Sequence, residues 1–457
     1  MAYLSTRGGV TPPQSFIDVL MSGLAPDGGL FVPESWPRLD MKALEGKSYV
    51  EVAEAVLLPF MDAQVAAEDL RKILSETYTP ALFGSDKITP LRPLEDKIML
   101  MELFHGPTLA FKDVALQFLG RLFDHVLEKS GRHLTIIGAT SGDTGSAAIE
   151  ACRGRKNITV HILHPHQRTS DVQRRQMTTV LDDNIHNIAL EGNFDDCQAF
   201  VKQAFADPDL RALNLSAINS INWARIIAQS VYYVTACLEL GGRPNFAVPT
   251  GNFGNVYAAY VAKQMGAPIG KLIIGSNRND ILTRFFESGT MSLEAVVPSL
   301  SPSMDIQISS NFERYLWDLL DHQPDRLRAV MDGFKATGRY SVTDAEHQTA
   351  LAQFHSFRCG DDETLALIGD VYQRTGVLLD PHTAVGVHAA KSAGFNDEVT
   401  VALACAHPAK FPDAVERATG VRPPLPPELA DLMTRPERFD VIPNDFAAVK
   451  QHILKTT

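Results

Sequence analysis

The apolar residues of this chain alternate between two spacings from about residue 98 onward. Short runs of β-branched and aliphatic residues are each followed by a stretch in which apolar residues recur at helical spacing. Strands that alternate with helices in this way are typical of a parallel sheet covered by helices on both faces. The pattern therefore predicts an α/β fold, with strand and helix pairs at 134–139 and 145–153, 158–163 and 170–181, 185–190 and 195–205, 245–248 and 255–265, and 271–275 and 281–287.

A long helical pattern over Trp223–Leu240 separates the predicted strands into two groups. Because wide twisted sheets tend to divide, we expect two doubly wound, mostly parallel sheets with a cleft between the domains that carry them. The N-terminal region differs, since helical patterns at 14–24, 49–58 and 67–78 accompany a turn that enters a strand at 25–33. The 457 residues suffice for two or three domains, and we expect an N-terminal α+β unit at 1–95 and α/β regions at 96–240 and 241–457.

The charge balance and the cysteines argue against several classes of partner. The formal net charge is −12 and the basic residues are dispersed, so most of the surface would repel a nucleic-acid backbone. The longest apolar run, 226–240, is interrupted by polar side chains, as in a buried helix rather than a membrane span. Five scattered cysteines without a CxxC pair, and no signal-peptide pattern, favour a reducing compartment. We expect a cytoplasmic protein that binds neither nucleic acid nor membranes.

A lysine at the start of a predicted helix is the first candidate for chemistry. Lys112 follows a strand-like run at 98–103 and opens a helical pattern that continues to residue 128. The N–H groups of a helix start disfavour a positive charge, as does burial beside Phe111, so the amine could act as a nucleophile. A lone lysine in this place more often extends its charge into water. The interpretation of Lys112 therefore depends on its context.

Two loops rich in glycine, each between a predicted strand and a predicted helix, are candidates for anion binding. The first, Gly138–Gly145, brings hydroxyl groups and backbone N–H groups to a helix start. It lacks the spacing of a dinucleotide-binding or P-loop motif. The second, Pro249–Asn255, contains two glycines that would let successive amides approach a phosphate closely. Each loop alone could also be an ordinary turn with a capping hydroxyl.

Two further polar stretches lie where the pattern calls for core residues. Asn219–Arg225 gathers Ser220, Asn222 and Arg225 ahead of an apolar helix, and arginine is well suited to grip a phosphate with two hydrogen bonds. Leu379–Gly386 presents His382 and Thr383 at a helix start. Taken alone, either stretch is more simply explained as a helix cap.

Taken together and in order, these segments resemble the fold-type II enzymes that depend on pyridoxal phosphate (PLP), and within them the bacterial and fungal branch of the threonine synthase family. The resemblance extends over essentially the whole chain. Any one segment is a weak signal, but the ordered set is specific. The segments that carry it are Tyr3–Arg7, Leu24–Pro33, Phe111–Asp113, Ser141–Gly145, Asn219–Arg225, Gly251–Asn255 and Asp380–Gly386.

This resemblance implies a role for each candidate group. Lys112 would hold PLP as a Schiff base. Thr383 would face the pyridine nitrogen of the cofactor, and a hydroxyl in that place makes the ring a milder electron sink than a carboxylate would. Asp143 would lie near the ring oxygen, where many fold-type II relatives have asparagine. An ionised aspartate would repel an ionised ring oxygen, so a proton would be shared or the contact would be indirect. The remaining residues divide into a cofactor-phosphate loop (Gly251, Asn252, Phe253, Gly254, Asn255), a group by the substrate carboxylate (Thr140, Ser141, Thr144) and a group by the substrate phosphate (Ser220, Asn222, Arg225).

The implied reaction converts O-phospho-L-homoserine and water into L-threonine and phosphate by γ-elimination and β-addition of water. Lys112 would be the general base and acid, and Arg225 with its neighbours would stabilise the leaving phosphate. The implied protein is a lyase of threonine biosynthesis, as a monomer or a homodimer. Ser5, Thr6 and Arg7 also favour a phosphorylated substrate over those of other dehydratases of this fold.

Three alternatives stay open at this point. Another amino-acid dehydratase of the same fold type would share the cofactor and the overall fold. A threonine-synthase-like phospho-lyase would share the elimination steps and release a 2-oxo acid. A protein that binds PLP or a phospho-ligand without turnover would share the fold, because a fold does not guarantee an activity. The run of His161, His164 and His166 could suggest a metal site, but it ends a predicted strand and has no acidic or cysteine neighbour at ligand spacing, so we expect no metal.

Overall fold

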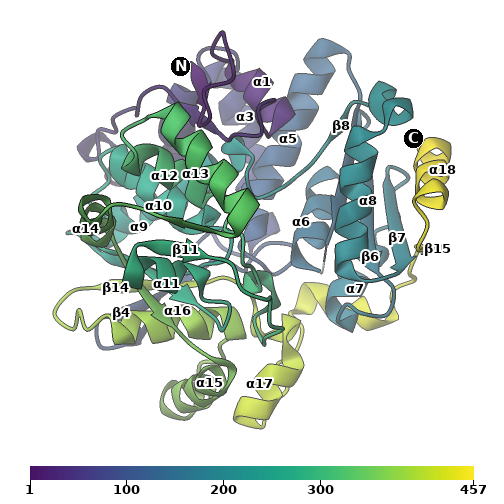
Figure 1. Cartoon of the computed structure of the whole chain (residues 1–457). Helices are drawn as coiled ribbons and strands as arrows, with labels where there is room; N and C mark the ends of the chain where they lie inside the picture. The colour runs from purple at the N-terminus through teal and green to yellow at the C-terminus, as the bar shows by residue number, and fades with distance from the viewer. Residues whose placement is uncertain (141) are drawn as a thin grey trace. The chain divides into compact units, whose positions relative to one another are not determined.

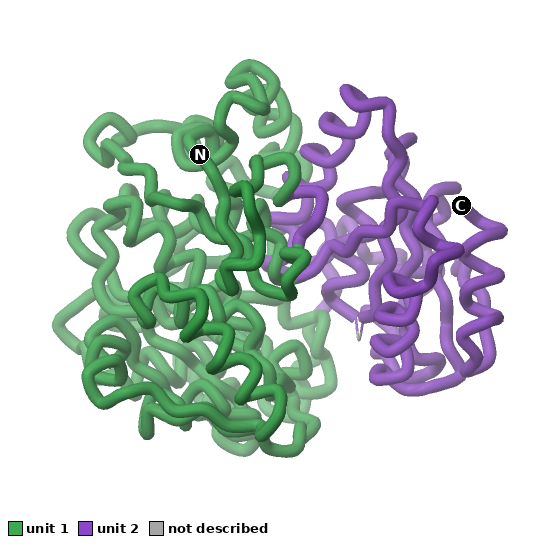
Figure 2. The backbone as a smooth tube through the Cα atoms, turned by 45° about the horizontal axis from the view of Figure 1, so that its top comes forward, with its two compact units in different colours: residues 1–19, 24–105, 220–423 green, residues 20–23, 106–219, 424–457 purple. Residues whose placement is uncertain are grey.

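The structure of this chain is a computed structural model that describes residues 1–140 and 142–457. It contains two compact units, shown in green and purple in Figure 2. Unit 1 comprises residues 1–19, 24–105 and 220–423, and unit 2 comprises residues 20–23, 106–219 and 424–457. Each unit carries one large sheet with helices packed on it (Figure 1), which confirms the α/β class with two mostly parallel sheets. The division of the chain at residues 95 and 240 stays a prediction.

The sheet of unit 2 has five parallel strands in the order β15-β7-β6-β5-β8. All residues of the central strand β6 are buried, as is typical of parallel strands covered on both faces. Apolar side chains of β5, β6 and β7 pack against α8 and α18 in one core. The strands are β5 (Leu134–Ala139), β6 (Ile158–Pro165), β7 (Ile185–Glu191), β8 (Leu215–Ser216) and β15 (Asp440–Pro443), and the helices are α5 (Lys112–Ser130), α6 (Asp143–Cys152), α7 (Asp171–Thr178), α8 (Phe194–Ala206) and α18 (Phe446–Thr456).

Helices α5 and α6 approach each other closely at a glycine. A Cβ atom on Gly120 would lie 2.1 Å from the carbonyl oxygen of Ala151, a distance that no larger residue could tolerate. Because Lys112 begins α5 and Asp143 begins α6, this contact helps to set the spacing of the two helix starts.

The sheet of unit 1 has six strands in the order β13-β10-β9-β14-β4-β3, parallel except for β3, which runs antiparallel to β4. The strands are β3 (Leu91–Glu95), β4 (Ile98–Glu102), β9 (Asn245–Pro249), β10 (Leu272–Ser276), β13 (Phe354–Arg358) and β14 (Thr400–Ala404). Two small antiparallel pairs join β1 (Tyr3–Ser5) to β2 (Phe31–Pro33) and β11 (Thr290–Ser292) to β12 (Arg339–Ser341).

Helices of unit 1 surround this sheet and the N-terminal segment. Helix α16 packs directly on β9, where a Cβ atom on Gly386 would come within 3.0 Å of the Pro249 ring. The remaining helices are α1 (Phe16–Ser22, which continues into unit 2), α2 (Tyr49–Leu57), α3 (Ala67–Thr77), α4 (Pro80–Phe83), α9 (Trp223–Leu240), α10 (Gly254–Gln264), α11 (Ile281–Ser288), α12 (Phe312–Leu319), α13 (Pro324–Thr337), α14 (Asp344–Gln353), α15 (Asp361–Thr375), α16 (Pro381–Ser392) and α17 (Pro412–Thr419). Within the described part of the chain, no helix is both long and apolar enough to cross a bilayer.

The histidines at the end of β6 are buried in unit 2. The His161 ring stacks on His186 with centroids 4.9 Å apart, and its Nε2 lies 3.0 Å from Thr457 Oγ1. Burial lowers the pKa of His161 to about 3 and the pKa of His164 to about 4. Among the described residues, no group of three or more His, Cys, Asp or Glu side chains is arranged to hold a metal ion.

We expect unit 2 to lose stability as the pH falls below about 6.5. Unfolded histidines take up a proton near pH 6.5, whereas folded His161 and His164 stay neutral to about pH 3 and 4. Their contribution is therefore fully present above pH 6.5 and is lost on acidification, by about 1.4 kcal/mol per pH unit for each histidine. Urea unfolding at several pH values from 7.5 to 4.5 would measure this. The slope should flatten in His164→Phe but not in His166→Gln, at a half-buried position just beyond the strand, and an unchanged slope in His164→Phe would contradict the assignment.

Candidate active site

Lys112 lies at the start of α5, as its sequence context predicts. Its side chain is 6 % exposed, and the amine nitrogen lies 3.2 Å from Asp143 Oδ2 and 5.2 Å from the centroid of the Phe111 ring. Burial opposes the charged form of a lysine amine, whereas a neighbouring carboxylate such as Asp143 supports it.

A local hydrogen-bond network fixes the turn before Lys112. The Asp113 carboxylate accepts from the Thr108 backbone N–H at 2.8 Å and from the Thr108 hydroxyl at 2.7 Å. Gly106 is required here, since a Cβ atom would lie 2.4 Å from that of Asp113. Asp113 therefore holds in place the turn that precedes Lys112.

Asp143 is held between Lys112 and a residue that the sequence did not reveal. Its second carboxylate oxygen accepts a hydrogen bond at 3.0 Å from Nε2 of Gln173, which lies on α7. Gly142 has a φ of 153°, and a Cβ atom there would come within 2.5 Å of the Gln173 side chain. The glycine of this loop is therefore needed for the contact that orients Asp143.

The other three residues expected around this loop differ in their surroundings and in whether the structure describes them. Thr140 is buried, and its Oγ1 accepts from the backbone N–H groups of Gly142 and Gly145, both at 3.0 Å, so it caps the start of α6. Thr144 is half-buried in the first turn of α6. Ser141 lies outside the described residues.

The Gly251–Asn255 loop of unit 1 connects β9 to α10, as predicted. Phe253 has a φ of 62°, a left-handed conformation that turns the chain sharply into the helix. A Cβ atom on Gly251 would lie 3.2 Å from the Met304 Cα, so the loop backbone is closely packed on that side. The first amides of α10 have no acceptor within the helix, and amides at a helix start are able to bind an anion.

Asn255 directs an unpaired donor into the core of unit 1. Its Oδ1 accepts hydrogen bonds from the hydroxyls of Tyr232 and Tyr233, the latter at 2.8 Å. Its Nδ2 is buried and has no hydrogen-bond partner among the described residues. Buried donors are nearly always paired, so an amide that two tyrosines hold in this orientation suits a ligand with acceptor oxygens, such as a phosphate.

Arg225 is a second unpaired buried donor in unit 1. It is 4 % exposed, and its Nη1 has no hydrogen-bond partner among the described residues. Burial lowers the pKa of the guanidinium to about 10, so it stays charged at neutral pH. An uncompensated buried charge is costly, and an anionic ligand would supply the missing partner.

The Ser220–Asn222 segment lies against the Gly251–Asn255 loop. A Cβ atom on Gly254 would be 3.5 Å from the carbonyl oxygen of Ser220. Asn222 caps α9, since its Oδ1 accepts from the Ala224 N–H at 3.0 Å. The structure thus brings together two of the segments that the sequence singled out for phosphate binding.

Thr383 is buried at the start of α16, and its hydroxyl is engaged on two sides. It donates to Asp380 Oδ2 and accepts from the Cys405 backbone N–H at 3.2 Å. Asp380 also accepts from His382 Nδ1 at 2.8 Å. These contacts fix the position of the Thr383 hydroxyl at the start of α16.

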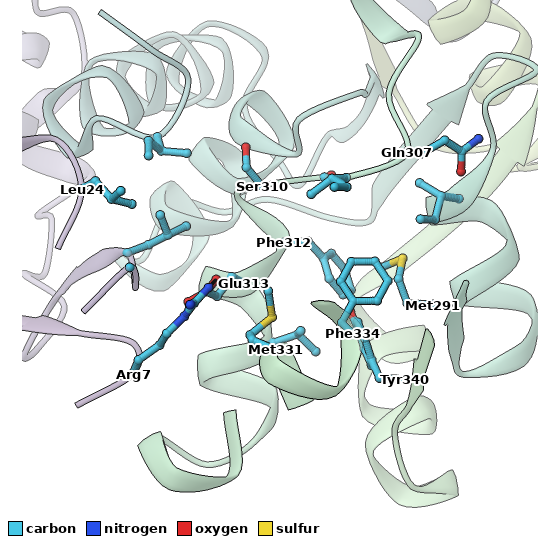
Figure 3. Close-up of a pocket in the computed structure, with 17 residues that line it drawn as sticks. Arg7, Leu24, Met291, Gln307, Ser310, Phe312, Glu313, Met331, Phe334 and Tyr340 are labelled. Carbon is cyan, nitrogen blue, oxygen red and sulfur yellow. Dashed lines mark hydrogen bonds and ion pairs between the residues drawn. The ribbon is translucent and has the colours of Figure 1, made fainter. Parts of the chain in front are cut away.

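The N-terminal Ser5-Thr6-Arg7 group is engaged by carboxylates rather than open to a phosphate. Ser5 donates to Asp27, while Thr6 and Arg7 donate to Glu313, with Arg7 Nη2 2.8 Å from Glu313 Oε2. The Glu313 contact raises the pKa of Arg7. Figure 3 shows this pair at the wall of a cavity of about 220 Å³, lined mostly by apolar side chains such as Met291, Phe312, Met331 and Phe334.

Sequence reasoning missed Gln173, the two tyrosines, and Asn311 and Arg314, which support the loops. Glutamine and tyrosine within helical patterns carry no signal that separates them from ordinary helix residues. Asn311 and Arg314 do lie in a polar run, Ser309-Ser-Asn-Phe-Glu-Arg314, that interrupts apolar surroundings. That run could have been singled out in the same way as Asn219–Arg225.

The two parallel sheets, the buried lysine at a helix start and the glycine-rich anion loop are together the marks of a fold-type II PLP-dependent enzyme. Family models agree: "Pyridoxal-phosphate dependent enzyme" matches residues 82–336, "Threonine synthase N terminus" matches residues 2–78, and "Threonine synthase, C-terminal" matches residues 383–453. The chain belongs to the threonine synthase family.

Individual relatives are similar over their full length. A threonine synthase of Pseudomonas aeruginosa is 52 % identical over 99 % of this chain and 98 % of that protein. The crystal structure of a PLP-bound threonine synthase from Brucella melitensis superposes with a TM-score of 0.97 at 48 % identity, covering 100 % of this chain and 99 % of that one. The yeast threonine synthase structure gives a TM-score of 0.95 at 38 % identity, covering 100 % and 98 %.

Proposed function

We propose that this chain converts O-phospho-L-homoserine and water into L-threonine and phosphate. The observation that carries the proposal is the pair of buried, unpaired donors in unit 1, Arg225 Nη1 and Asn255 Nδ2. A substrate and a cofactor that each carry a phosphate would supply the acceptors that these groups need. Membership of the threonine synthase family selects this reaction among those of fold-type II enzymes.

The Gly251–Asn255 loop suits the phosphate of PLP, and Lys112 suits a covalent bond to its aldehyde. The Gly251–Asn255 loop offers backbone amides and the oriented Asn255 side chain to the cofactor phosphate. Thr383, whose hydroxyl is held by Asp380 and by the Cys405 N–H, is the residue that we assign to the ring nitrogen. Bound PLP supplies an electron-withdrawing ring that stabilises negative charge at the substrate Cα.

Lys112 is the group that we assign to proton transfer. Once its nitrogen is no longer engaged by the cofactor, the amine can take the proton from the substrate Cα and assist removal of a proton at Cβ. Asp143 lies 3.2 Å from this nitrogen and would stabilise the ammonium that forms. Gln173 keeps the carboxylate in place for this role.

Arg225, with Ser220 and Asn222, is assigned to the phosphate that leaves from Cγ. Negative charge builds up on the leaving oxygen as its bond to carbon breaks, and a buried guanidinium stabilises that charge strongly in a site without water. Arg225 is suited to this role because it is buried and forms no ion pair among the described residues. The same group would bind the phosphate of the intact substrate.

Asp143→Asn should shift the pH at which the amine of Lys112 reacts. The carboxylate favours the ammonium form, so its loss leaves more of the amine neutral at a given pH. We expect the rate at which full-length apoenzyme binds PLP covalently to reach half of its maximum at a lower pH than in the wild-type enzyme. Stopped-flow absorbance across pH 6–9 would measure this, with Asp182→Asn in the same unit as the control. A midpoint at the wild-type pH would show that Asp143 does not act on Lys112 electrostatically.

The direct test of the proposed function is product analysis. Purified enzyme is supplied with PLP and O-phospho-L-homoserine, and phosphate, L-threonine and 2-oxobutyrate are quantified. Equal amounts of phosphate and threonine support the proposal. Phosphate accompanied by 2-oxobutyrate would instead identify a phospho-lyase, and no phosphate release would overturn both assignments.

A further inference from the structure

Arg314 is a fully buried arginine that grips the backbone of two distant segments of unit 1. Its side chain is 0 % exposed, and it lies 5.5 Å from the centroid of the Trp223 ring. Nε donates to the carbonyl of Phe31 at 2.9 Å, and Nη2 donates to the carbonyl of Ile221 at 2.7 Å. Only arginine has a rigid fork of donors that can reach several acceptors at once.

The third donor of Arg314 sets the orientation of a buried amide. Nη1 donates to Oδ1 of Asn311, which is 0 % exposed. With its oxygen turned to the guanidinium, the amide presents Nδ2 on its other side, where it donates to the carbonyls of Ser220 and Asn252, both at 3.0 Å. The Asn311 backbone N–H also donates to the Asn252 carbonyl, at 3.1 Å. Arg314 and Asn311 thus tie both candidate phosphate segments together.

Because a peptide unit is planar, a contact that holds its carbonyl group also fixes the direction of the next N–H group. In a trans peptide the C=O group and the next N–H group point to opposite sides. Holding the Asn252 carbonyl therefore directs the Phe253 N–H away from Asn311. Ser309 acts in the same way, because its hydroxyl donates to the Gly251 carbonyl at 2.7 Å and so directs the Asn252 N–H. The loop amides are aimed by contacts made on the opposite side of the backbone.

We propose that Arg314 is a positioning residue for phosphate binding, which acts through Asn311 on the carbonyls of Ser220 and Asn252. It contacts no ligand itself. Its effect is to hold the amides of the Gly251–Asn255 loop in the direction that a phosphate requires. This inference rests on the proposed function, since it takes that loop as the site of the PLP phosphate.

The test compares two ligands that differ only in the phosphate. Full-length apoenzyme is titrated with PLP and with pyridoxal, and the dissociation constants are obtained from quenching of protein fluorescence. In Arg314→Lys a single ammonium replaces the fork, so the Asn311 amide is no longer held. We expect the Kd for PLP to rise by about tenfold or more, while the Kd for pyridoxal changes by less than about twofold. General damage to the fold would weaken both ligands alike.

A second variant addresses the case in which Arg314→Lys does not fold. Asn311→Asp keeps the side-chain shape and the acceptor for Arg314, but it removes the donors to the two carbonyls. The same selective loss of PLP affinity is expected. Arg328→Lys is the matched control, because Arg328 also donates to a backbone carbonyl, that of Arg7 at 2.8 Å, but lies exposed at the surface.

The results distinguish a wrong assignment of the phosphate loop from a wrong assignment of Arg314. If wild-type apoenzyme binds PLP no more tightly than pyridoxal, the assignment of the phosphate loop fails, and with it part of the proposed function. If the wild-type enzyme strongly prefers PLP and the folded variants keep that preference, the positioning role of Arg314 is wrong. An equal loss for both ligands in Arg314→Lys and Asn311→Asp would also overturn it.

Discussion

Lys112→Ala is expected to reduce the release of phosphate from O-phospho-L-homoserine by at least about three orders of magnitude. The variant loses both the nucleophile for the cofactor aldehyde and the base that we assign to the substrate protons. The absorption band that depends on covalent attachment of PLP should disappear at the same time. Absorption spectra and a phosphate-release assay on the same preparations would measure both effects.

The fold should tolerate this change. Lys112 is the first residue of α5, and alanine keeps this helix start because it has the highest helix propensity of all residues. The matched control is Lys129→Ala, at the exposed end of the same helix, which should leave the spectrum and the rate unchanged. A Lys112→Ala enzyme that keeps a protein-bound absorption band and more than a tenth of the activity would contradict the assignment.

Arg225→Met is expected to raise the KM for O-phospho-L-homoserine by about a hundredfold, because two or more charge-assisted hydrogen bonds to phosphate are lost. Although the substitution weakens substrate binding, we do not expect it to lower the stability of the fold. Arg225 is a buried charge without an ion pair among the described residues, so an apolar side chain of similar length should leave the free energy of unfolding unchanged or raise it by about 1–3 kcal/mol. Steady-state kinetics and urea unfolding in phosphate-free buffer would test the two parts.

Inorganic phosphate provides the control for this variant. A ligand that binds only the folded protein raises the melting temperature, and it does so more strongly the lower its Kd. Phosphate should therefore stabilise the wild-type enzyme and have little effect on Arg225→Met. Arg71→Met, which removes an exposed arginine paired with Glu54, should keep the phosphate effect. A destabilised Arg225→Met that still responds to phosphate would indicate a structural role for this arginine.

Much of the fold could be predicted from local patterns. The helix over Trp223–Leu240 and the strand over 134–139 have the bounds that their patterns predict, and the other predicted elements of the two alternating regions shift at their ends by at most three residues. These elements are defined by the spacing of apolar residues within each segment, which sequence displays directly. The central position of β14 between β9 and β4 could not be predicted, because strand order depends on pairing between segments far apart in the chain.

Some features of the candidate site could likewise be predicted from sequence, and others could not. Lys112 and both glycine loops could be singled out as candidates, because the proposed chemistry needs particular residue types at helix starts. Whether a polar residue at such a start faces a ligand or another side chain could not be read from its type. The Ser5-Thr6-Arg7 group illustrates this, since the carboxylate that engages Thr6 and Arg7 is Glu313, 307 and 306 residues away in the chain.

The sequence by itself therefore determined the class of fold, and it predicted the positions of Lys112 and of the Gly251–Asn255 loop at helix starts, since each depends on residues adjacent in the chain. Only the tertiary structure decided what surrounds them. It paired Asp143 with Lys112 and Gln173, left Arg225 and Asn255 with unpaired buried donors, and used Arg314 to join Phe31, Ile221 and Asn311. The physical reason is that burial and pairing set the energy of a polar group, and both arise from chain segments that meet only on folding.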